Sequence, residues 1–409
     1  MSEFVPEGWS EVTLGSVSNI IMGQSPSSDT YNDERNGLPF FQGKADFGNR
    51  YPKVRVWCST PIKIADSGSI LFSVRAPVGD INLSNHLCCI GRGLAAITGT
   101  KAVQDYLYQK ILFTRSKFKL ASQGSTFEAI NGSELRDFKL VLPPLPEQKK
   151  IAAILTSVDD VIEKTQAQID KLKDLKTGMM QELLTRGVGV DGKPHMEFKD
   201  SPVGRIPKGW DVQYLADCCS KMTNGYVGST RDIYVDKGVD YVLCQNVRPN
   251  FFVEKTHKYV RQEFHQKNIR ACLQEGDVLT VQTGAGNGDT CVVPKSYEGA
   301  NCHALIISRP KTEILNPYFL AEYMNSDQGK RRVNIIATGG AHPHLNTTDL
   351  RKESIPLPPI EEQNQIVRSL QSVQKKYTLL EERKRKLEGN KKALMQDLLT
   401  GKVRVKADS

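Results

Sequence analysis

An internal repeat constrains this chain more than any other feature, because a repeated sequence predicts a repeated fold. Residues 5–9 read Val-Pro-Glu-Gly-Trp, and residues 206–210 read Ile-Pro-Lys-Gly-Trp. A Leu-Pro-Pro motif followed by Glu-Gln at 142–148 returns, with small changes, at 357–363. The chain has 409 residues, which is too long for one ordinary core. The sequence therefore predicts two copies of one unit.

The first part of each unit predicts a mixed module of strands and short helices. Short β-like runs lie between clusters of Gly, Asn and Pro, which are typical of turns. The expected strands are Lys53–Trp57, Ile70–Val74, Tyr241–Cys244, Val278–Gln282 and Ala304–Ser308, and the expected helices are Ala102–Phe113 and Pro317–Asn325. The predicted fold class is therefore α+β, with two mixed α/β modules.

The second part of each unit predicts a long helix. Each helix follows a proline-rich segment and carries glutamate in its first turn, which the helix dipole favours. Apolar residues then recur alternately four and three positions apart, the pattern of a coiled coil. The expected seam consists of Ile151, Leu155, Val158, Ile162, Ile169, Leu172, Met179 and Leu183, and of Ile366, Leu370, Val373, Tyr377, Leu380, Leu387, Leu394 and Leu398. The register is the same in both helices, and even the polar break at Lys176 returns at Lys391.

These elements predict a definite order along the chain. The expected segments are a module at 1–146, a helix at 147–186, a linker at 187–205, a module at 206–360, a helix at 361–402 and a tail at 403–409. A helix of roughly 40 residues spans about 60 Å. The second helix can return along the first only by running antiparallel to it. We therefore expect a coiled-coil rod with one module at each end and a pseudo-two-fold axis between them.

Composition narrows the class of protein. The formal net charge is +9 and the pI is about 8.9, which permits a polyanionic partner without proving one. Nine cysteines, with no Cys-x-x-Cys spacing, indicate reduced thiols, as expected for a cytoplasmic protein. No apolar run long enough to cross a membrane is present, and the first nine residues do not resemble a secretory signal.

Several short motifs suggest catalysis, but each also has a structural explanation. Asn316-Pro317-Tyr318-Phe319 resembles an amino-methyltransferase signature, but lacks its second proline and a preceding cofactor loop, so we expect Asn316 to cap a helix. Residues 284–288 are glycine-rich but lack the Lys-Ser/Thr of a nucleotide loop, so we expect a turn. Glu147-Gln148-Lys149 resembles a nuclease motif without its metal carboxylate. His342 and His344 lack the further ligand that zinc requires.

Taken together, the duplicated motifs resemble the specificity subunit of type I restriction–modification systems, over nearly the whole chain. The resemblance rests on the Pro-x-Gly-Trp starts, the segments 68–80 and 276–289, the Gly-Ser-Thr loop at 124–131 and the proline motif leading into each helix. The second module departs from the usual Gly-Ser-Thr loop, because it has Gly-Gly-Ala at 339–341.

The resemblance implies a non-catalytic DNA-binding subunit. Its two modules would be target recognition domains, each reading half of a bipartite, asymmetric site in double-stranded DNA. The helices would set the spacing and dock two modification subunits, which carry S-adenosylmethionine and methylate adenine. Two restriction subunits, which use ATP and Mg²⁺, can join them. No cofactor is expected in this chain itself, and both methylation and restriction would require it.

Polar residues in the module loops are the candidates for DNA contact. Gln and Asn suit adenine, Arg and Lys suit guanine, and basic side chains elsewhere hold phosphates. The candidates are Gln24, Ser25, Gln42, Lys44, Arg75, Ser125 and Thr126 in the first module, and Asn224, Tyr226, Gln245, Asn246, Arg248, Gln282, Asn287, His342 and His344 in the second.

Two other classes remain open at this point. A structural adaptor whose modules bind protein would show no salt-dependent affinity for DNA. A fused enzyme would need the catalytic motifs that are missing above. The sequence gives neither the recognised DNA sequence nor the length of its spacer.

Overall fold

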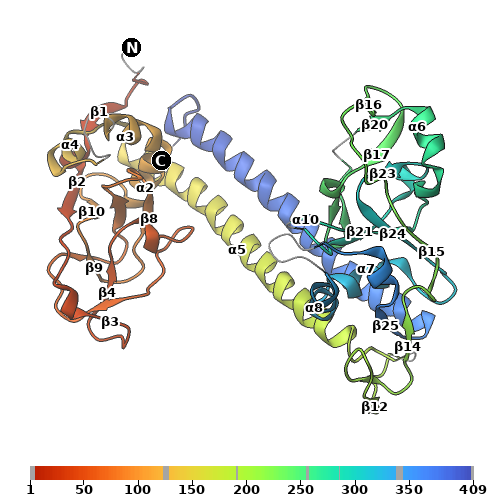
Figure 1. Ribbon diagram of the computed structural model, residues 1–409. Helices are drawn as coiled ribbons and strands as arrows, with labels where there is room; N and C mark the ends of the chain where they lie inside the picture. Colours follow the sequence, from red (N-terminus) through yellow and green to blue (C-terminus); the bar gives the residue numbers. More distant parts are fainter. Residues whose placement is uncertain are drawn as a thin grey trace. The chain divides into compact units, whose positions relative to one another are not determined.

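The computed structural model describes residues 5–122, 129–189, 192–254, 258–284, 286–337 and 344–406. The chain forms two compact units. Unit 1 comprises Met1–Ala167 with Glu381–Ser409, and unit 2 comprises Gln168–Leu380. Each unit therefore holds one module together with a part of each long helix (Figure 1).

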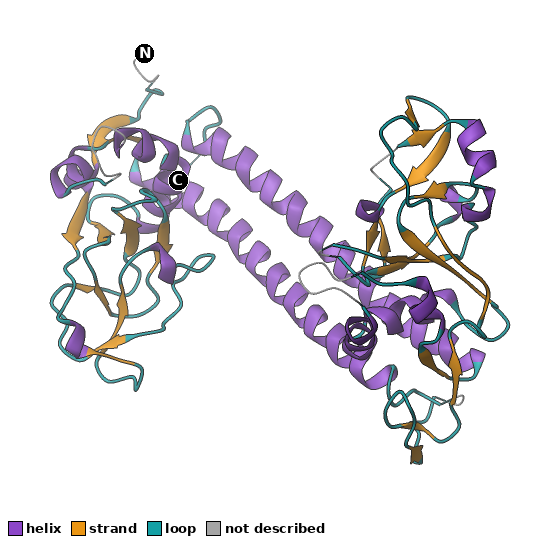
Figure 2. Ribbon diagram, in the orientation of Figure 1, coloured by secondary structure: helices purple, strands orange, loops and turns teal. Residues whose placement is uncertain are grey.

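Two sheets form the module of unit 1 (Figure 2). The first is antiparallel, in the order β2 (Ser18–Met22), β10 (Leu94–Gly99), β7 (Ile70–Ser73) and β8 (Ile81–Leu83). The second has the order β3 (Tyr31–Asn32), β5 (Trp57–Cys58), β4 (Leu38–Phe41), β9 (Cys88–Ile90) and β6 (Ile64–Ala65), with β4 and β9 parallel. A third ladder joins β1 (Ser10–Thr13) to β11 (Lys139–Leu142). The short helices are α1 (Leu14–Val17), α2 (Gln104–Phe113), α3 (Arg115–Ser122) and α4 (Gly132–Asp137).

Unit 2 repeats this topology. Its antiparallel sheet has the order β15 (Cys219–Asn224), β24 (Leu305–Pro310), β21 (Val278–Val281) and β22 (Thr290–Val292). Its second sheet has the order β16 (Tyr234–Val235), β20 (Tyr259–Val260), β17 (Val239–Val242) and β23 (Asn301–Cys302), with β17 and β23 parallel. Three two-stranded ladders pair β14 (Asp211–Tyr214) with β25 (Ser354–Leu357), β12 (Phe198–Lys199) with β13 (Ile206–Pro207), and β18 (Val247–Arg248) with β19 (Phe251–Phe252). The helices are α6 (Gln262–Lys267), α7 (Pro317–Asn325), α8 (Asp327–Ile336) and α9 (Thr347–Arg351).

The two long helices are α5 (Leu145–Leu183) and α10 (Ile360–Leu399). None of the predicted seam positions is exposed, whereas exposed residues lie between them. In unit 1, Lys391 forms an ion pair of 2.6 Å with Asp159, and in unit 2, Lys176 donates a 2.8 Å hydrogen bond to Gln374. The two residue numbers add to 550 in both pairs. A constant sum is what two antiparallel helices in one register require, because one residue number rises as the other falls. The predicted fold class, with its duplicated modules and antiparallel helices, is confirmed.

The hydrophobic cores explain why each unit includes parts of both helices. In unit 1, Ile151 and Leu155 of α5 share a core cluster with Leu398 and Leu399 of α10. In unit 2, Leu184, which follows α5, shares a cluster with Ile366 and Leu370 of α10 and with much of the second module. The middle of each helix contributes no residue to these clusters.

A buried glutamate at the start of each long helix holds the segment that follows the other helix. In unit 2, the carboxylate of Glu362 accepts hydrogen bonds from the backbone N–H groups of Val188 and Gly189, from His195 Nε2 and from Trp210 Nε1, at 2.8–3.0 Å. In unit 1, Glu147 accepts two bonds of 2.9 Å from Arg404. The nuclease-like motif at Glu147 therefore has a structural role.

The boundaries of several elements differ from the sequence-based expectation by a few residues, and three of the differences have a clear physical reason. The expected strand Lys53–Trp57 is reduced to β5, because the backbone N–H of Lys53 instead bonds the carbonyl of Asp46. In place of the expected strand Tyr241–Cys244, β17 spans Val239–Val242, because a 3₁₀ turn begins at Cys244. The expected linker 187–205 is part of unit 2, because it contains β12 and buries Val203 to 3% exposure.

Candidate nucleic-acid interface

The loops that carry the candidates in unit 1 leave its two sheets at the same edge. In the antiparallel sheet, Met22 at the end of β2 pairs with Ala95, and Ser73 at the end of β7 pairs with Leu94. In the second sheet, the end of β4 lies beside the end of β9, since Phe41 pairs with Ile90. The segments that follow β2, β4, β7 and β9 therefore meet at one edge, which we call edge 1.

The described candidates of the first module all lie in these segments. Gln24 is exposed, and its backbone N–H bonds the carbonyl of Ile90 at 3.0 Å. The hydroxyl of Ser25 accepts a hydrogen bond from the backbone N–H of Arg92 at 3.2 Å. Gln42 is exposed directly after β4. The fold thus brings together side chains that are far apart in the sequence.

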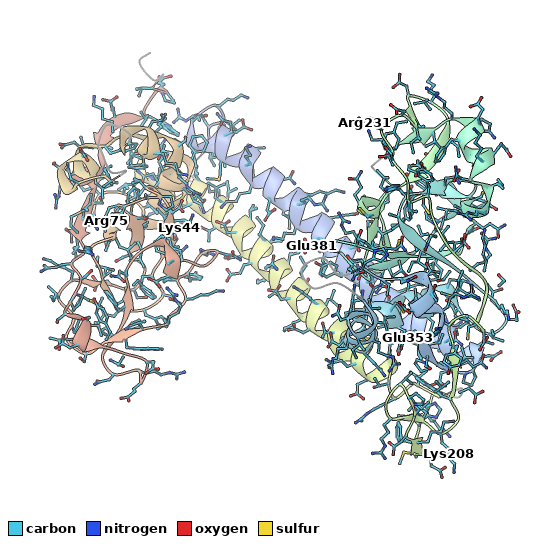
Figure 3. The ribbon with its side chains drawn as sticks, in the orientation of Figure 1. Lys44, Arg75, Lys208, Arg231, Glu353 and Glu381 are labelled. Carbon is cyan, nitrogen blue, oxygen red and sulfur yellow. The ribbon has the colours of Figure 1, made fainter. Side chains whose placement is uncertain are left out.

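Two basic candidates complete edge 1. Lys44 is half exposed and forms a 2.6 Å ion pair with the buried carboxylate of Asp80, to which Arg115 also binds. Arg75 is exposed after β7, and its backbone bridges to Ala129. Figure 3 shows where Lys44 and Arg75 lie on the module. Ser125 and Thr126 fall outside the described residues.

The same topology forms an equivalent edge in unit 2, edge 2. Asn224 at the end of β15 pairs with Ile306, and Val281 at the end of β21 pairs with Leu305. Tyr226 follows β15 and is half-buried, with its ring packed edge-to-face against Phe264 at 5.0 Å. The exposed His344 bridges to Thr283. His342 lies outside the described residues.

Two candidates of the second module are corrected by the structure. Asn246 is fully buried, where its side-chain oxygen accepts from the N–H of Leu243 and its amide donates to the carbonyl of Val253. Gln282 is 2% exposed, and its amide donates to Asn224. Both side chains form hydrogen bonds inside the fold, because buried polar groups need partners. The side-chain oxygen of Gln282 is buried without a hydrogen-bond partner among the described residues. They cannot contact bases in this structure.

The remaining candidates of the second module differ in position. Gln245 is exposed in the 3₁₀ turn that follows β17, at edge 2. Arg248 is exposed on β18, and its guanidinium bonds the carbonyl of Val247 at 2.8 Å. Asn287 lies in the turn after β21, and both polar atoms of its side chain are buried without a hydrogen-bond partner among the described residues. An unpaired buried amide is costly, so a ligand that paired with Asn287 would bind more strongly.

Sequence reasoning missed one residue at each edge. Arg92 is exposed in the turn before β10, between two glycines. His303 lies in the corresponding turn before β24, with its ring 6.3 Å from that of Tyr226. Burial lowers the pKa of His303, which favours a neutral imidazole that can both donate and accept a hydrogen bond. A basic residue between two glycines was the only sequence signal for Arg92, and His303 had none.

The other motifs have structural roles in the described residues. Asn316 caps α7, because its side-chain oxygen accepts from the backbone N–H of Tyr318 at 2.8 Å, with Pro317 in the first turn. This confirms the predicted cap.

Within the described residues, no helix is both long and apolar enough to span a membrane. None of the nine cysteines forms a disulfide, and all nine lie within the described residues.

The fold and the two edges define a duplicated recognition protein, and comparison with known proteins identifies its class. The sequence matches the family described as type I restriction modification DNA specificity domain twice, at residues 6–174 and 207–389. The chain therefore belongs to this family. It is a type I specificity subunit, which recognises DNA and is not the catalytic subunit.

Individual relatives agree with this assignment. A putative type I restriction enzyme MjaX specificity subunit of Methanocaldococcus jannaschii is 42% identical over 190 residues, which are 46% of this chain and 45% of that relative. The MjaVIII specificity subunit of the same organism is 25% identical over 98% of this chain and 94% of its own length. The crystal structure of a type I restriction–modification S subunit from M. genitalium is 12% identical, and has a TM-score of 0.64 over 95% of this chain and 96% of that one. That likeness shows the fold alone.

Proposed function

We propose that edge 1 and edge 2 each read one half of a bipartite, asymmetric site in double-stranded DNA. The observation that carries this proposal is that two edges of the same topology present different side chains. At equivalent positions, edge 1 has Gln24, Lys44 and Arg75, whereas edge 2 has Tyr226, Cys244 and Thr283. Equivalent scaffolds with different polar groups suit two different half-sites, because base edges are distinguished by their donors and acceptors.

We further propose that α5 and α10 set the distance between the half-sites and dock two modification subunits. These partners would supply S-adenosylmethionine and methylate adenine, and two restriction subunits with ATP and Mg²⁺ would join them. The long helices support this role, because Leu175 of α5 and Leu379 of α10 are 49% and 64% exposed. The complex would act in the cytoplasm, where its DNA substrate lies.

Methylome sequencing of the host tests this function. Strains with and without the gene would be compared, and the gene would be restored with either the natural chain or an Arg75→Ala, Arg92→Ala double variant. We expect the gene to be required for methylation of one motif with two defined parts separated by an unspecified gap. The double variant should reduce methylation of that motif.

Native mass spectrometry tests the assembly. We expect the chain to form a complex with two modification subunits, and to show no methyltransferase or nuclease activity when purified alone. A methylome unchanged by deletion of the gene, or a motif without a gap, would contradict the proposed function. Salt-independent association with protein but not with DNA would instead support the adaptor alternative.

A further inference from the structure

A cavity of about 480 Å³ lies at edge 1, among the candidates for DNA contact. The 3₁₀ turn that follows β4 lines one part of it, and residues 76–77, in the turn after β7, line another. The stacked rings of Tyr31 and Phe40, with their centres 4.7 Å apart, add apolar surface. Lys44, which Figure 3 labels, and Arg55 are its basic lining residues. The cavity therefore combines apolar walls with two cations from different segments.

A buried carboxylate holds each of these cations in place. Nζ of Lys44 lies 2.6 Å from the carboxylate of Asp80, which is buried. Nε of Arg55 donates a 3.2 Å hydrogen bond to the buried Asp46, which also accepts from the backbone N–H of Gln42 at 2.8 Å. The side chains of Lys44 and Arg55 are themselves 49% and 60% exposed. The carboxylates therefore lie inside the fold, and the cations face the solvent.

This cluster of ion pairs carries a net positive charge. Asp80 also binds Arg115, the first residue of α3, so the cluster contains three cations and two carboxylates. Arg55 uses Nε and Nη2 to bind Asp46, and its Nη1 has no partner among the described residues. A guanidinium has five N–H donors in all. The cluster therefore has charge and donors left for an anion outside the chain.

The second module has a neutral turn at the equivalent place. In the 3₁₀ turn after β17, Cys244 takes the place of Lys44, and Asn246 takes that of Asp46. The amide oxygen of Asn246 accepts a 2.9 Å hydrogen bond from the backbone N–H of Leu243, so a neutral side chain is enough to close this turn. The charges in the turn of unit 1 are therefore not needed for the turn itself, which favours a role in binding.

We propose that this cavity binds a phosphodiester group of the DNA backbone, with the phosphate oxygens against Lys44 and Arg55. A phosphate fits better than a base, because each phosphate carries a negative charge, whereas a neutral base edge would leave the charge of the cluster unbalanced. Such a contact is the same for every sequence, and it fixes the position of the strand whose bases edge 1 reads. The proposal rests on the proposed reading of DNA at edge 1.

The salt dependence of DNA binding tests this site. The complex assembled with its modification subunits is titrated at several KCl concentrations against two fluorescein-labelled duplexes, one with the recognised sequence and one without it. In a Lys44→Gln, Arg55→Gln double variant, the slope of the logarithm of the binding constant against the logarithm of salt concentration should become shallower by about 2, because each phosphate contact contributes about 0.9. At fixed salt, the affinity for both duplexes should fall by the same factor.

A charge-preserving variant separates binding from folding. The double variant should fold, because Asp80 keeps its contact with Arg115 and Asp46 keeps its hydrogen bonds from the backbone. A Lys44→Arg, Arg55→Lys variant keeps both positive charges and should keep the slope of the natural chain. Urea unfolding of both variants checks that each retains its fold.

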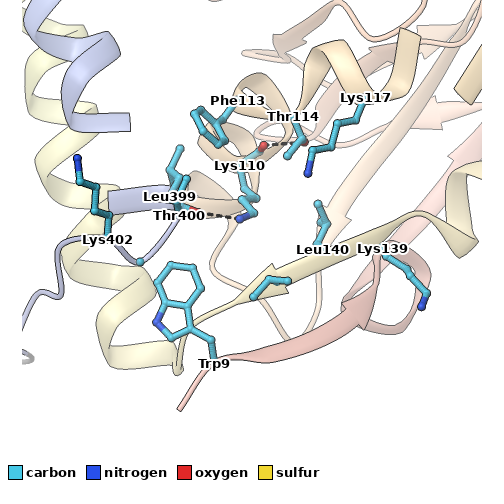
Figure 4. A pocket seen from close by; sticks show the side chains of 12 residues that line it. Trp9, Lys110, Phe113, Thr114, Lys117, Lys139, Leu140, Leu399, Thr400 and Lys402 are labelled. Carbon is cyan, nitrogen blue, oxygen red and sulfur yellow. Dashed lines mark hydrogen bonds between the residues drawn. The ribbon is translucent and has the colours of Figure 1, made fainter. Parts of the chain in front are cut away.

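A second basic cavity of unit 1, of about 370 Å³, provides the matched control (Figure 4). Lys139 and Lys402 line it and form exposed ion pairs with Glu11 and Asp397 at 2.7 and 3.6 Å. Lys139 pairs with Thr13 in the ladder that precedes β2, whereas edge 1 lies beyond the end of β2. A Lys139→Gln, Lys402→Gln variant removes the same charge as the test variant, and it should leave the slope unchanged.

Three results would overturn the proposal. The first is a slope that the test variant leaves unchanged, or that the control variant changes equally. The second is a loss of affinity confined to the duplex with the recognised sequence, which would mean that Lys44 and Arg55 read bases. The third is saturable binding of inorganic phosphate that the test variant loses while it binds DNA normally, which would assign the cavity to a free anion. Absence of salt-dependent DNA binding by the natural complex would contradict the proposed function itself, and this site with it.

Discussion

The position of Arg75 relative to the end of β7 determines which edge of the sheet its side chain lies on. It follows β7 and is exposed at edge 1, whereas Lys101 follows β10 and is exposed at the opposite edge of the same sheet. Arg75→Ala should weaken specific DNA binding by about 1–3 kcal/mol if Arg75 contacts a base. Lys101→Ala is the matched control and should change affinity little. Titration of the assembled complex with its DNA site at fixed salt checks this, and equal losses in both variants would contradict edge 1.

Lys110 provides a prediction about pH. Burial lowers its pKa to about 8 from 10.5, so the folded state loses this proton before the unfolded state does. Between these two pH values the unfolded state binds more protons, and the free energy of unfolding therefore rises with pH. The full shift corresponds to about 3 kcal/mol.

Lys110→Met removes this titration. Relative to the natural chain, the variant should therefore be more stable at pH 7 than at pH 10, although it also loses the hydrogen bond to Leu399. Urea unfolding of both proteins at the two pH values measures the difference. A difference in free energy of unfolding that does not change with pH would show that Lys110 is not held in a desolvated state.

The candidate residues also show what sequence can reveal about a site. Residue type and loop position selected Gln42 and Arg75, which the fold brings to one edge. The same criteria selected Asn246 and Gln282, which are buried. Burial of an amide depends on partners far along the chain, such as Asn224 for Gln282, and no local pattern encodes these partners.

At the scale of elements, the seam of the long helices gives a direct test. Leu155 and Leu370 are fully buried, whereas Leu175 and Leu379 on the same helices are 49% and 64% exposed. Leu155→Ala and Leu370→Ala should each cost about 2–5 kcal/mol, because each leaves a cavity in a core. Leu175→Ala and Leu379→Ala should each stay within about 0.5 kcal/mol of the natural chain.

Urea unfolding of the four variants measures these costs. Similar losses at buried and exposed positions would contradict the seam. Variants at the exposed positions have a second use, since the proposed docking of modification subunits on the helices can be measured with them without loss of the fold.

The elements differ in how far sequence predicts them. The long helices were predicted in register, because a seven-residue pattern repeats many times and needs no knowledge of the partner. The helix α7 was predicted to the residue, because Asn316 and Pro317 are local signals. The strand β5 has only two residues, and its extent is set by its neighbours β3 and β4. No periodicity can be read from so short a strand.

At the scale of the whole molecule, the sequence repeat predicted the duplicated architecture. The hydrogen bonds of one two-stranded ladder in each unit show where a module can be cut out of the chain and replaced. In unit 2, β14 pairs with β25, so Asp211 and Leu357 lie opposite each other. In unit 1, Ser10 and Leu142 are opposite in the same way. If the exchanged segment begins and ends at such a pair of opposite residues, both strands of the ladder that closes the module are exchanged together. Glu147 and Glu362 lie outside the exchanged segments and stay with their helices.

Exchange of residues 211–357 for the same segment of a relative should change one half of the recognised DNA sequence and leave the other half unchanged. Each unit has its own core clusters, so the unexchanged module should keep its fold and its edge. The matched exchange of residues 10–142 should change the opposite half. Methylome sequencing of the two strains checks both outcomes together. If either exchange altered both halves in a protein that still folds and assembles, the two edges would not read DNA independently, and the duplicated topology would have to serve a shared site.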